Sequence, residues 1–282
     1  MASFLPYIQQ VSVFLFLVGS MLAMGMQLQP RALVSALRDA RLVSVALGLN
    51  FLVAPAFAWL LTNWIQLERG YAIGLLLLSS AAGAPFLPKL VESAHGDLLT
   101  SGALMILLTV GTILSMPLAL PFLIHGLQID PWKIAGPLVL LIGLPLAVGL
   151  VIHGCAAGLA TRFAPVIARI GNAGLLLLVA LLVGQNLRAL PGLIGGGAII
   201  TAGVYFLGLF AAGWLCGGVR PEIRGVVGLA TGARNFGAAF APAAAFDDPK
   251  ISLMLVVSAL VTLPLSFAAA GWVRARQTIL PA

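Results

Sequence analysis

A single charged residue, Arg234, lies within a part of the chain that is otherwise apolar enough to be surrounded by lipid. It is close to two other polar residues, Thr231 and Asn235. Placing a guanidinium in a bilayer costs about 3 kcal/mol on insertion scales, so such a residue indicates a functional site. A charge beside a break in a membrane helix is typical of a transporter. The glycines that predict such a break here are Gly225, Gly228, Gly232 and Gly237.

Prolines predict a second interrupted helix, in the run from Leu78 to Pro88. Pro85 lacks an amide N–H and clashes with the preceding turn, and Pro88 repeats this effect. Pro85 and Arg234 are 149 residues apart, about half the chain. Four predicted spans lie between the two interrupted segments, so the third and the eighth span cross the membrane in opposite directions. We therefore expect an inverted repeat in which two discontinuous helices cross near the midplane. The alternative is that Gly and Pro are simply frequent in membrane helices.

The composition is that of a membrane protein. Of 282 residues, 61% are hydrophobic and 8% are charged, whereas a soluble domain carries about 25% charged residues. The isoelectric point near 10.3 does not indicate a nucleic-acid partner, because the basic residues are scattered through the loops and form no stripe. Cys155 and Cys216 lack the spacing of a metal or redox site,. We expect membrane lipid as a partner and leave the oligomeric state open.

Nine segments are apolar enough to span a bilayer, which takes about 20 residues. Short connections hold nearly all the charge, and no stretch is polar enough to form a second, soluble domain. The predicted fold is all-α and polytopic, with a single transporter domain over residues 1–282. The segments are 9–28, 42–64, 71–94, 98–125, 134–157, 166–187, 193–217, 222–246 and 251–273.

Basic residues predict the orientation, because cytoplasmic loops are enriched in Lys and Arg. The sequence places ten on one side and four on the other. We expect a multi-pass protein of the cell's inner (plasma) membrane, with the N-terminus outside and the C-terminus in the cytoplasm. The ten are Arg31, Arg38, Arg41, Lys89, Arg162, Arg169, Arg220, Arg224, Arg274 and Arg276, and the four are Arg69, Lys133, Arg188 and Lys250.

Five runs follow one another along the chain: Met24–Pro30, Asn50–Leu61, Gly74–Pro88, His95–Asp97 and Ala230–Asn235. In this order and spacing they resemble the bile acid:sodium symporter family. The first resembles a G-M-x-L-x-P turn after an early helix, and the second resembles the next helix. The third resembles the family's first crossover, and the fourth falls where the family has a short Gly-Asn turn. The last resembles the second crossover, usually E-x-G-x-Q-N. The ordered set is similar to nine-span members.

This resemblance implies a two-part fold and a transport mechanism. A panel would contain about 9–28 and 134–187, and a core would contain about 42–125 and 193–273. A small organic anion would bind in the crevice between them, beside the crossover. Movement of the panel against the core would expose the anion to each side in turn, which is alternating access.

The residues at the family's two sodium sites differ in this chain. Typical members use a Ser-Asn pair, hydroxyls of the following helix, and the Glu and Gln of the second motif. Sodium is a hard cation that needs oxygen ligands, and a guanidinium offers none. We therefore expect these sites to be largely lost, which makes sodium coupling doubtful. We interpret Arg234 as a tethered cation at the crossover. The family positions fall on Leu87, Pro88, Ser101, Met105, Ala230 and Arg234.

Each of the other polar residues has a structural and a functional interpretation. Lys89 is a cytoplasmic anchor or helps Arg234 attract an anion. Gln185 and Asn186 form a polar helix end or contact the substrate. Thr109 and Thr112 are expected to bond to carbonyls of their own helix. The candidate substrate and crossover residues are Arg234, Asn235, Thr231, Gly232, Pro85, Ala84, Ser101, Lys89, Gln185 and Asn186.

The sequence contains no arrangement typical of an enzyme, such as H-E-x-x-H, G-x-S-x-G or a P-loop,. All eight acidic residues fall in predicted loops or segment ends, which argues against a proton relay inside the membrane,. We expect no cofactor and no metal site. The prediction is a secondary transporter of a small organic anion. The alternative is a non-transporting membrane sensor on the same fold, which a flux measurement would distinguish.

Overall fold

The computed structural model describes residues 5–27, 38–124, 131–185 and 197–279, and this part of the chain is helical without strands. Two helices contain a π-helical turn, η1 (Leu49–Val53) and η2 (Val139–Gly143). The α-helices are α1 (Leu5–Gln27), α3 (Ala40–Gly48), α4 (Ala54–Trp64), α5 (Arg69–Ser80), α6 (Leu87–Ser93), α7 (Leu98–Leu123), α8 (Pro131–Leu138), α9 (Leu144–Cys155), α10 (Ala157–Gln185), α12 (Ala198–Cys216), α13 (Pro221–Gly232), α14 (Phe236–Ala243) and α15 (Pro249–Ile279).

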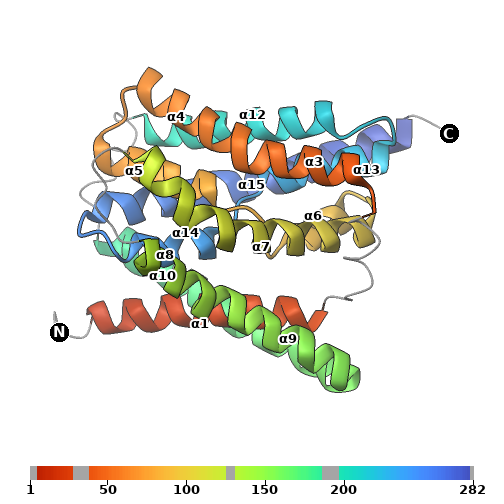
Figure 1. Cartoon of the computed structure of the whole chain (residues 1–282), viewed down its shortest axis with the longest axis horizontal. Coiled ribbons are helices and arrows are strands. Elements are labelled where there is room, and N and C mark those ends of the chain that lie inside the picture. Colours follow the sequence, from red (N-terminus) through yellow and green to blue (C-terminus); the bar gives the residue numbers. More distant parts are fainter. Residues whose placement is uncertain (1–4, 28–37, 125–130, 186–196, 280–282) are drawn as a thin grey trace.

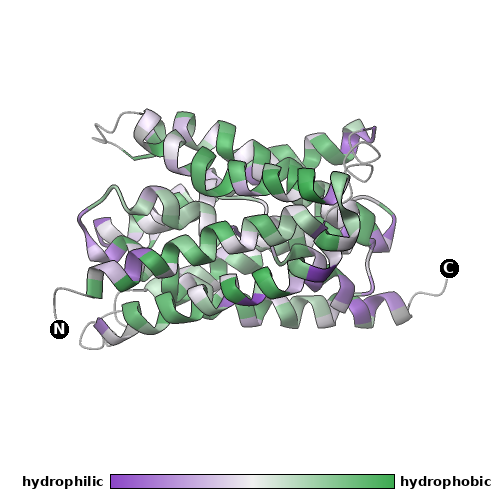
Figure 2. Cartoon of the chain, turned by 90° about the horizontal axis from the view of Figure 1, so that it is seen from below, coloured by the Kyte–Doolittle hydropathy of each residue, from purple (hydrophilic) through white to green (hydrophobic). Residues whose placement is uncertain are grey.

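Seven helical stretches of the described chain are long and apolar enough to cross a membrane. They correspond to seven of the nine predicted segments. The other two segments, 71–94 and 222–246, are the ones predicted to be interrupted, and each is divided into two short helices, α5 with α6 and α13 with α14. Figure 2 shows that hydrophobic residues dominate the middle of the bundle and hydrophilic residues gather at its two ends. The all-α polytopic fold is confirmed.

The boundary of the sixth predicted segment is wrong. We expected it to begin at residue 166, but α10 begins at Ala157, directly after the end of α9. The prediction left Thr161 and Arg162 outside the segment. Both lie on exposed positions of the helix, as Arg169 does, and polar side chains there need no break in the backbone.

Prolines account for the two π-helical turns. The N–H of Ala54 donates to the carbonyl of Leu49, five residues earlier, and Pro55 follows with no N–H of its own. Leu144 and Pro145 repeat this arrangement after η2. A π turn is one way in which a long helix accommodates the missing N–H and the steric clash of a proline. The 42–64 segment therefore stays one continuous helix that contains Asn50 within its π turn.

The helices form three layers in Figure 1. One edge consists of α1, α9 and α10, and the opposite edge consists of α3, α4, α12 and α13, with α5, α6, α7, α14 and α15 between them. The backbones of α1 and α9 nearly touch, since a Cβ atom on Gly149 would lie 2.9 Å from the Cα of Gly25. His153 Nδ1 bonds to the carbonyl of Met26 at 2.7 Å. Small residues allow such close packing of membrane helices.

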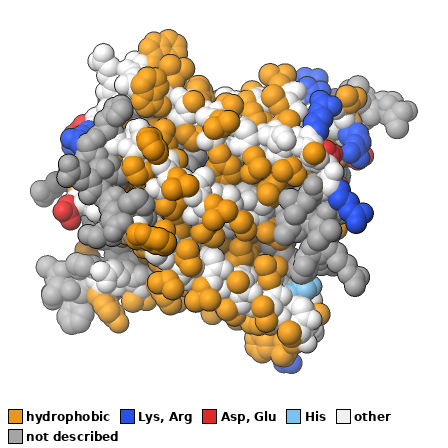
Figure 3. Space-filling view, viewed as in Figure 1, with side chains coloured by type: hydrophobic (Ala, Val, Ile, Leu, Met, Phe, Trp, Pro, Cys, Tyr) orange, Lys and Arg blue, Asp and Glu red, His pale blue; other side chains and the backbone are white. Residues whose placement is uncertain are grey.

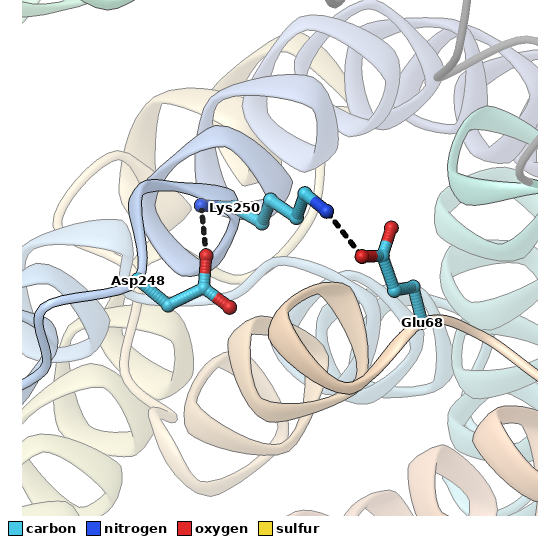
Figure 4. A network of polar contacts seen from close by, with 3 residues as sticks. All are labelled: Glu68, Asp248 and Lys250. Carbon is cyan, nitrogen blue, oxygen red and sulfur yellow. Dashed lines mark hydrogen bonds and ion pairs between the residues drawn. The ribbon is translucent and has the colours of Figure 1, made fainter.

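An exposed charge network joins the beginnings of α5 and α15 (Figure 4). Lys250 forms an ion pair with Glu68, and its backbone N–H donates to a carboxylate oxygen of Asp248 at 2.9 Å. Exposed ion pairs contribute little to stability, because water and salt screen them. The network aligns the first turns of α5 and α15 at one end of the bundle. The burial of apolar side chains stabilises the interior.

The α1–α9 contact predicts a difference between two glycines of α9. Gly149→Ala should destabilise the protein by about 2 kcal/mol, because the new methyl group would collide with the backbone of α1,. Gly154→Ala is the control, since nothing lies within 4 Å of its Cβ position. Thermal unfolding in detergent measures both. Equal melting temperatures for the two variants would contradict the close packing.

Candidate functional site at the helix crossover

The first break leaves extended backbone between α5 and α6, and α7 provides its hydrogen-bond partners. The hydroxyl of Thr112 accepts from the N–H of Ala82 at 2.8 Å and lies 3.2 Å from its carbonyl oxygen. Thr109 donates to Met105 in its own helix and lies 3.2 Å from the Gly83 carbonyl. The prediction of bonds within the helix thus holds for Thr109, whereas Thr112 bonds across to the break. Unwound backbone needs such partners where water is absent.

The second break docks against the first. The N–H of Asn235 donates to the carbonyl of Ala81 at 3.0 Å, and its side-chain amide donates to Gly83 at 3.0 Å. The side-chain oxygen of Asn235 accepts from Ala238 and caps α14. These bonds join two breaks about 150 residues apart. They confirm that the two interrupted helices meet, and we call residues 81–86 and 233–235 the crossover.

Two residues of the first break show how the chain turns. Gly83 has a φ of +80°, a conformation that glycine adopts at little cost. Pro88 does not contribute to the break as we expected. It lies in the first turn of α6, where a proline costs nothing because its missing N–H has no partner in the helix.

Arg234 lies at the centre of the crossover with only 1% of its surface exposed. Nε donates to the carbonyl of Leu78 at 3.3 Å, and Nη2 donates to the carbonyl of Ser79. Nη1 donates to the side-chain oxygen of Asn50 at 2.7 Å and lies 3.5 Å from the carbonyl of Thr231. All three guanidinium nitrogens therefore have oxygen acceptors from the protein itself.

The acceptors around Arg234 share one electrostatic property. Leu78 and Ser79 belong to the last turn of α5, and Thr231 belongs to the last turn of α13. Carbonyls at a helix C-terminus carry partial negative charge, which a cation stabilises. No carboxylate is buried in the part of the chain that the structure describes. The guanidinium is thus held by neutral oxygens at two helix ends, which is the kind of oxygen set that binds a sodium ion.

Asn50 is a site residue that the sequence analysis missed as a partner of Arg234. It is fully buried in η1, and its Nδ2 donates to the carbonyl of Ala46 at 2.9 Å. This bond orients the amide so that Oδ1 faces the guanidinium. The available signal was an amide side chain within an apolar segment, which needs a partner when buried.

A cavity of about 730 Å³, here called the crossover cavity, lies along the first break. Residues of α1 and α10 line one side, and residues of α6, α7 and α14 line the other. Of the predicted site residues, Pro85 and Lys89 line it, and Arg234 does not. Arg234 is therefore placed to hold the crossover together, with its donors directed at the protein.

The remaining predicted residues are distributed around the crossover. Gln185 lines a second cavity of about 680 Å³, and Asn186 lies outside the described residues. Ser101 is buried and donates to the carbonyl of Leu98 in its own helix. Gly232, Thr231 and Ala84 are buried within the crossover region, and the hydroxyl of Thr231 bonds to Val227.

The family's sodium positions provide few side-chain oxygens here. Pro88 and Met105 line the crossover cavity, and Leu87 and Ala230 are buried. No cluster of three or more metal-binding side chains occurs among residues 5–27, 38–124, 131–185 and 197–279. Apart from the hydroxyl of Ser101, the side chains at these positions do not fit a sodium ion.

The model of the Sodium Bile acid symporter family matches residues 13–192. The match includes the first break and α6, α7 and α10 of the cavity lining with most of α1, and it ends before α12, α14 and Arg234. A comparison with curated proteins finds no match.

The contact between Asn50 and Arg234 predicts a loss of stability. Asn50→Ala should cost about 2 kcal/mol, because it removes an acceptor from a buried cation. Asn63→Ala is a matched control. Asn63 makes the same bond to the carbonyl four residues earlier, but it is exposed. The measurement is thermal unfolding in detergent, and similar losses for the two variants would show that Asn50 does not support Arg234.

Proposed function

Because the chain belongs to the sodium bile acid symporter family, we propose that it is a secondary transporter of a small organic anion, works by alternating access and does not require sodium. The observation that carries this proposal is the crossover cavity, which lies between two groups of helices beside a broken segment. Cavities of several hundred Å³ are typical of small-molecule sites.

The two cavities support alternating access. The crossover cavity reaches Gln27 at the end of α1, and the second cavity reaches Tyr7 near its beginning. Phe236 of α14 lines the crossover cavity, and Phe240, about one turn further along the same helix, lines the second cavity,. Leu17 of α1 is buried and would contact any side chain added at Gly237 of α14. A short apolar contact between α1 and α14 is a barrier that a small relative movement of two helix groups can open.

We infer that the moving parts are the panel and the core that the family resemblance implies. The panel would contain α1, α8, α9 and α10, and the core would contain the remaining helices. The close backbone packing of α1 against α9 supports a panel that moves as one body. The bonds of Arg234 and Asn235 support a core that is fastened at the crossover.

The lining supports an organic anion as the substrate. Phe16, Met24 and Phe236 offer apolar contact, and the amide of Asn172 offers hydrogen bonds. Lys89 is the only cation of the lining among the described residues, and Glu92 lies one turn away on α6. Both side chains are exposed; the ammonium of Lys89 attracts a carboxylate, and the neighbouring carboxylate of Glu92 weakens that attraction.

These two charges predict opposite effects on binding. Lys89→Gln should weaken anion binding about fivefold or more, and Glu92→Gln should leave it unchanged or strengthen it. Organic acids are first screened for thermal stabilisation of the purified protein, since a ligand at a hundred times its dissociation constant contributes about 2.7 kcal/mol. Titration of the best acid against each variant then measures affinity. Weaker binding in both variants, or in neither, would contradict an anion in this cavity.

Arg234 supports independence from sodium. Its guanidinium is bonded to carbonyls at the ends of α5 and α13, where a coupling ion would otherwise compensate the charge of helix ends. A second cation close by would be repelled by several kcal/mol at short range. We propose that the arginine holds the crossover permanently and that no coupling ion is needed to assemble it.

Replacing sodium by potassium should therefore change both flux and affinity by less than about threefold, well under about 1 kcal/mol. The measurement is uptake of the identified acid into proteoliposomes. Flux also decides between a transporter and a non-transporting sensor, because a sensor would bind the acid without moving it. A tenfold loss of affinity without sodium would contradict the role of Arg234.

Arg234→Ala should lower stability by about 3 kcal/mol with or without substrate, because it leaves Asn50 and two carbonyls without their donor,. Arg169→Ala, at an exposed position, is the control. Arg234→Gln combined with Ala230→Glu restores two family-type side chains and should make the melting temperature rise with added sodium. An unchanged melting temperature in Arg234→Ala would exclude the tethered cation.

We further propose that the N-terminus lies outside the cell and the C-terminus in the cytoplasm, in the inner (plasma) membrane. Ten basic residues against four support this orientation,. An added cysteine after Met1 should react with an impermeant thiol reagent in intact cells, once Cys155 and Cys216 are replaced.

A further inference from the structure

An arginine of α13 is held against an indole ring of α12. The guanidinium carbon of Arg224 lies 4.8 Å from the centre of the Trp214 ring, and its Nε donates to the Trp214 carbonyl at 2.7 Å. The cation–π contact and the hydrogen bond fix the plane of the guanidinium. Neither of its two Nη groups donates a hydrogen bond to another described residue.

A second arginine continues the same stack from α15. The Trp214 and Trp272 rings meet edge to face at 4.8 Å between centres, and the guanidinium of Arg276 lies 5.2 Å from the centre of Trp272. The order is therefore cation, indole, indole, cation. Three helices contribute to it, so the two positive charges have a defined spacing that does not depend on one flexible side chain.

Neither guanidinium is neutralised by a carboxylate in the described part of the chain. This distinguishes them from Lys250, which is paired with Glu68. A cation held by aromatic rings keeps its full charge and leaves the outer edge of its planar fork available. Such an edge matches phosphate, which accepts two parallel hydrogen bonds.

The surroundings of the stack are apolar and exposed. Leu215, directly after Trp214 in the chain, is 72% exposed, Val219 is 90% exposed, and Trp272 is 41% exposed. The stack lies where α12 ends, α13 begins and α15 approaches its end. Figure 3 shows that Lys and Arg side chains gather at this end of the molecule, beside a broad hydrophobic band. Tryptophan and arginine side by side are suited to the boundary between acyl chains and head groups.

We propose that Arg224, Trp214, Trp272 and Arg276 form a binding site for the phosphate head group of an anionic phospholipid, whose acyl chains cover Leu215 and Val219. The phosphate group contacts the free edge of one guanidinium, the second guanidinium adds to the positive charge that attracts the head group, and the indoles hold both guanidiniums in place. The exposed leucine and valine favour a lipid over a free phosphate anion, because a free anion would cover none of that apolar surface.

The site also has a connection to the crossover. Phe210 contacts both Trp214 and Trp272 and stacks on Phe206 at 6.2 Å between ring centres. A Cβ atom added to Gly232 would lie 3.0 Å from Phe206. A continuous row of aromatic rings therefore extends from the proposed lipid site to the end of α13 that faces Arg234. A lipid bound at one end of this row stabilises the helix that helps hold the cation at the other.

The test compares lipids on the purified protein. Phosphatidylglycerol should raise the melting temperature and remain bound in native mass spectrometry, and phosphatidylcholine at the same concentration should do neither. Arg224→Gln with Arg276→Gln should weaken phosphatidylglycerol binding at least fivefold. Arg276→Gln alone, on an exposed helix end, should weaken it about twofold to threefold and tests the site without disturbing the Arg224 hydrogen bond.

Arg162→Gln is the matched control, because Arg162 also lies over an aromatic ring, Phe163 at 6.0 Å, but it is exposed and outside the stack. It should change lipid binding by less than twofold. An equal loss with Arg162→Gln would mean that basic residues attract the lipid nonspecifically and would overturn the site. Glycerol 3-phosphate that stabilises the protein as strongly as phosphatidylglycerol, at equal concentration, would overturn the lipid as its source.

Discussion

The requirement that unwound backbone be hydrogen bonded where water is excluded governs this structure. Two helix breaks expose peptide groups inside the bundle, and their partners come from elements far away in sequence. Thr112 pairs with Ala82, Asn235 pairs with Ala81 and Gly83, and Arg234 pairs with the carbonyls of α5. Because each break provides hydrogen-bond partners for the other, the two interrupted segments stabilise each other.

A cation completes this arrangement, and its covalent attachment changes what the crossover can do. A bound ion stabilises only while its concentration is high enough, whereas a side chain is always present. The guanidinium also has a shape, so that its three nitrogens select acceptors in three directions,. The crossover is thus defined by the geometry of one side chain, and Asn50 and the π turn that positions it become part of the same unit.

Much of the fold could be predicted from the sequence. Composition indicates the long apolar segments, and the positions of Gly and Pro indicate where two of them are interrupted. The site could be predicted less well. Arg234 and Asn235 stood out as polar residues in an apolar segment, but the partnership with Asn50 depends on a π turn created by Pro55. The start of α10 was missed because exposed polar residues on a helix resemble a loop. Tertiary contacts decided both points.

The permanent attachment of Arg234 also has a consequence for energy. A cation that never leaves the protein cannot accompany the substrate, so each monovalent anion that crosses would carry its own negative charge through the membrane. A potential of about 100 mV, negative inside, contributes about 2.3 kcal/mol per charge. That force is directed outwards for an anion. A carrier built in this way would be driven by voltage to export its substrate, and uptake would need an outside concentration high enough to oppose it.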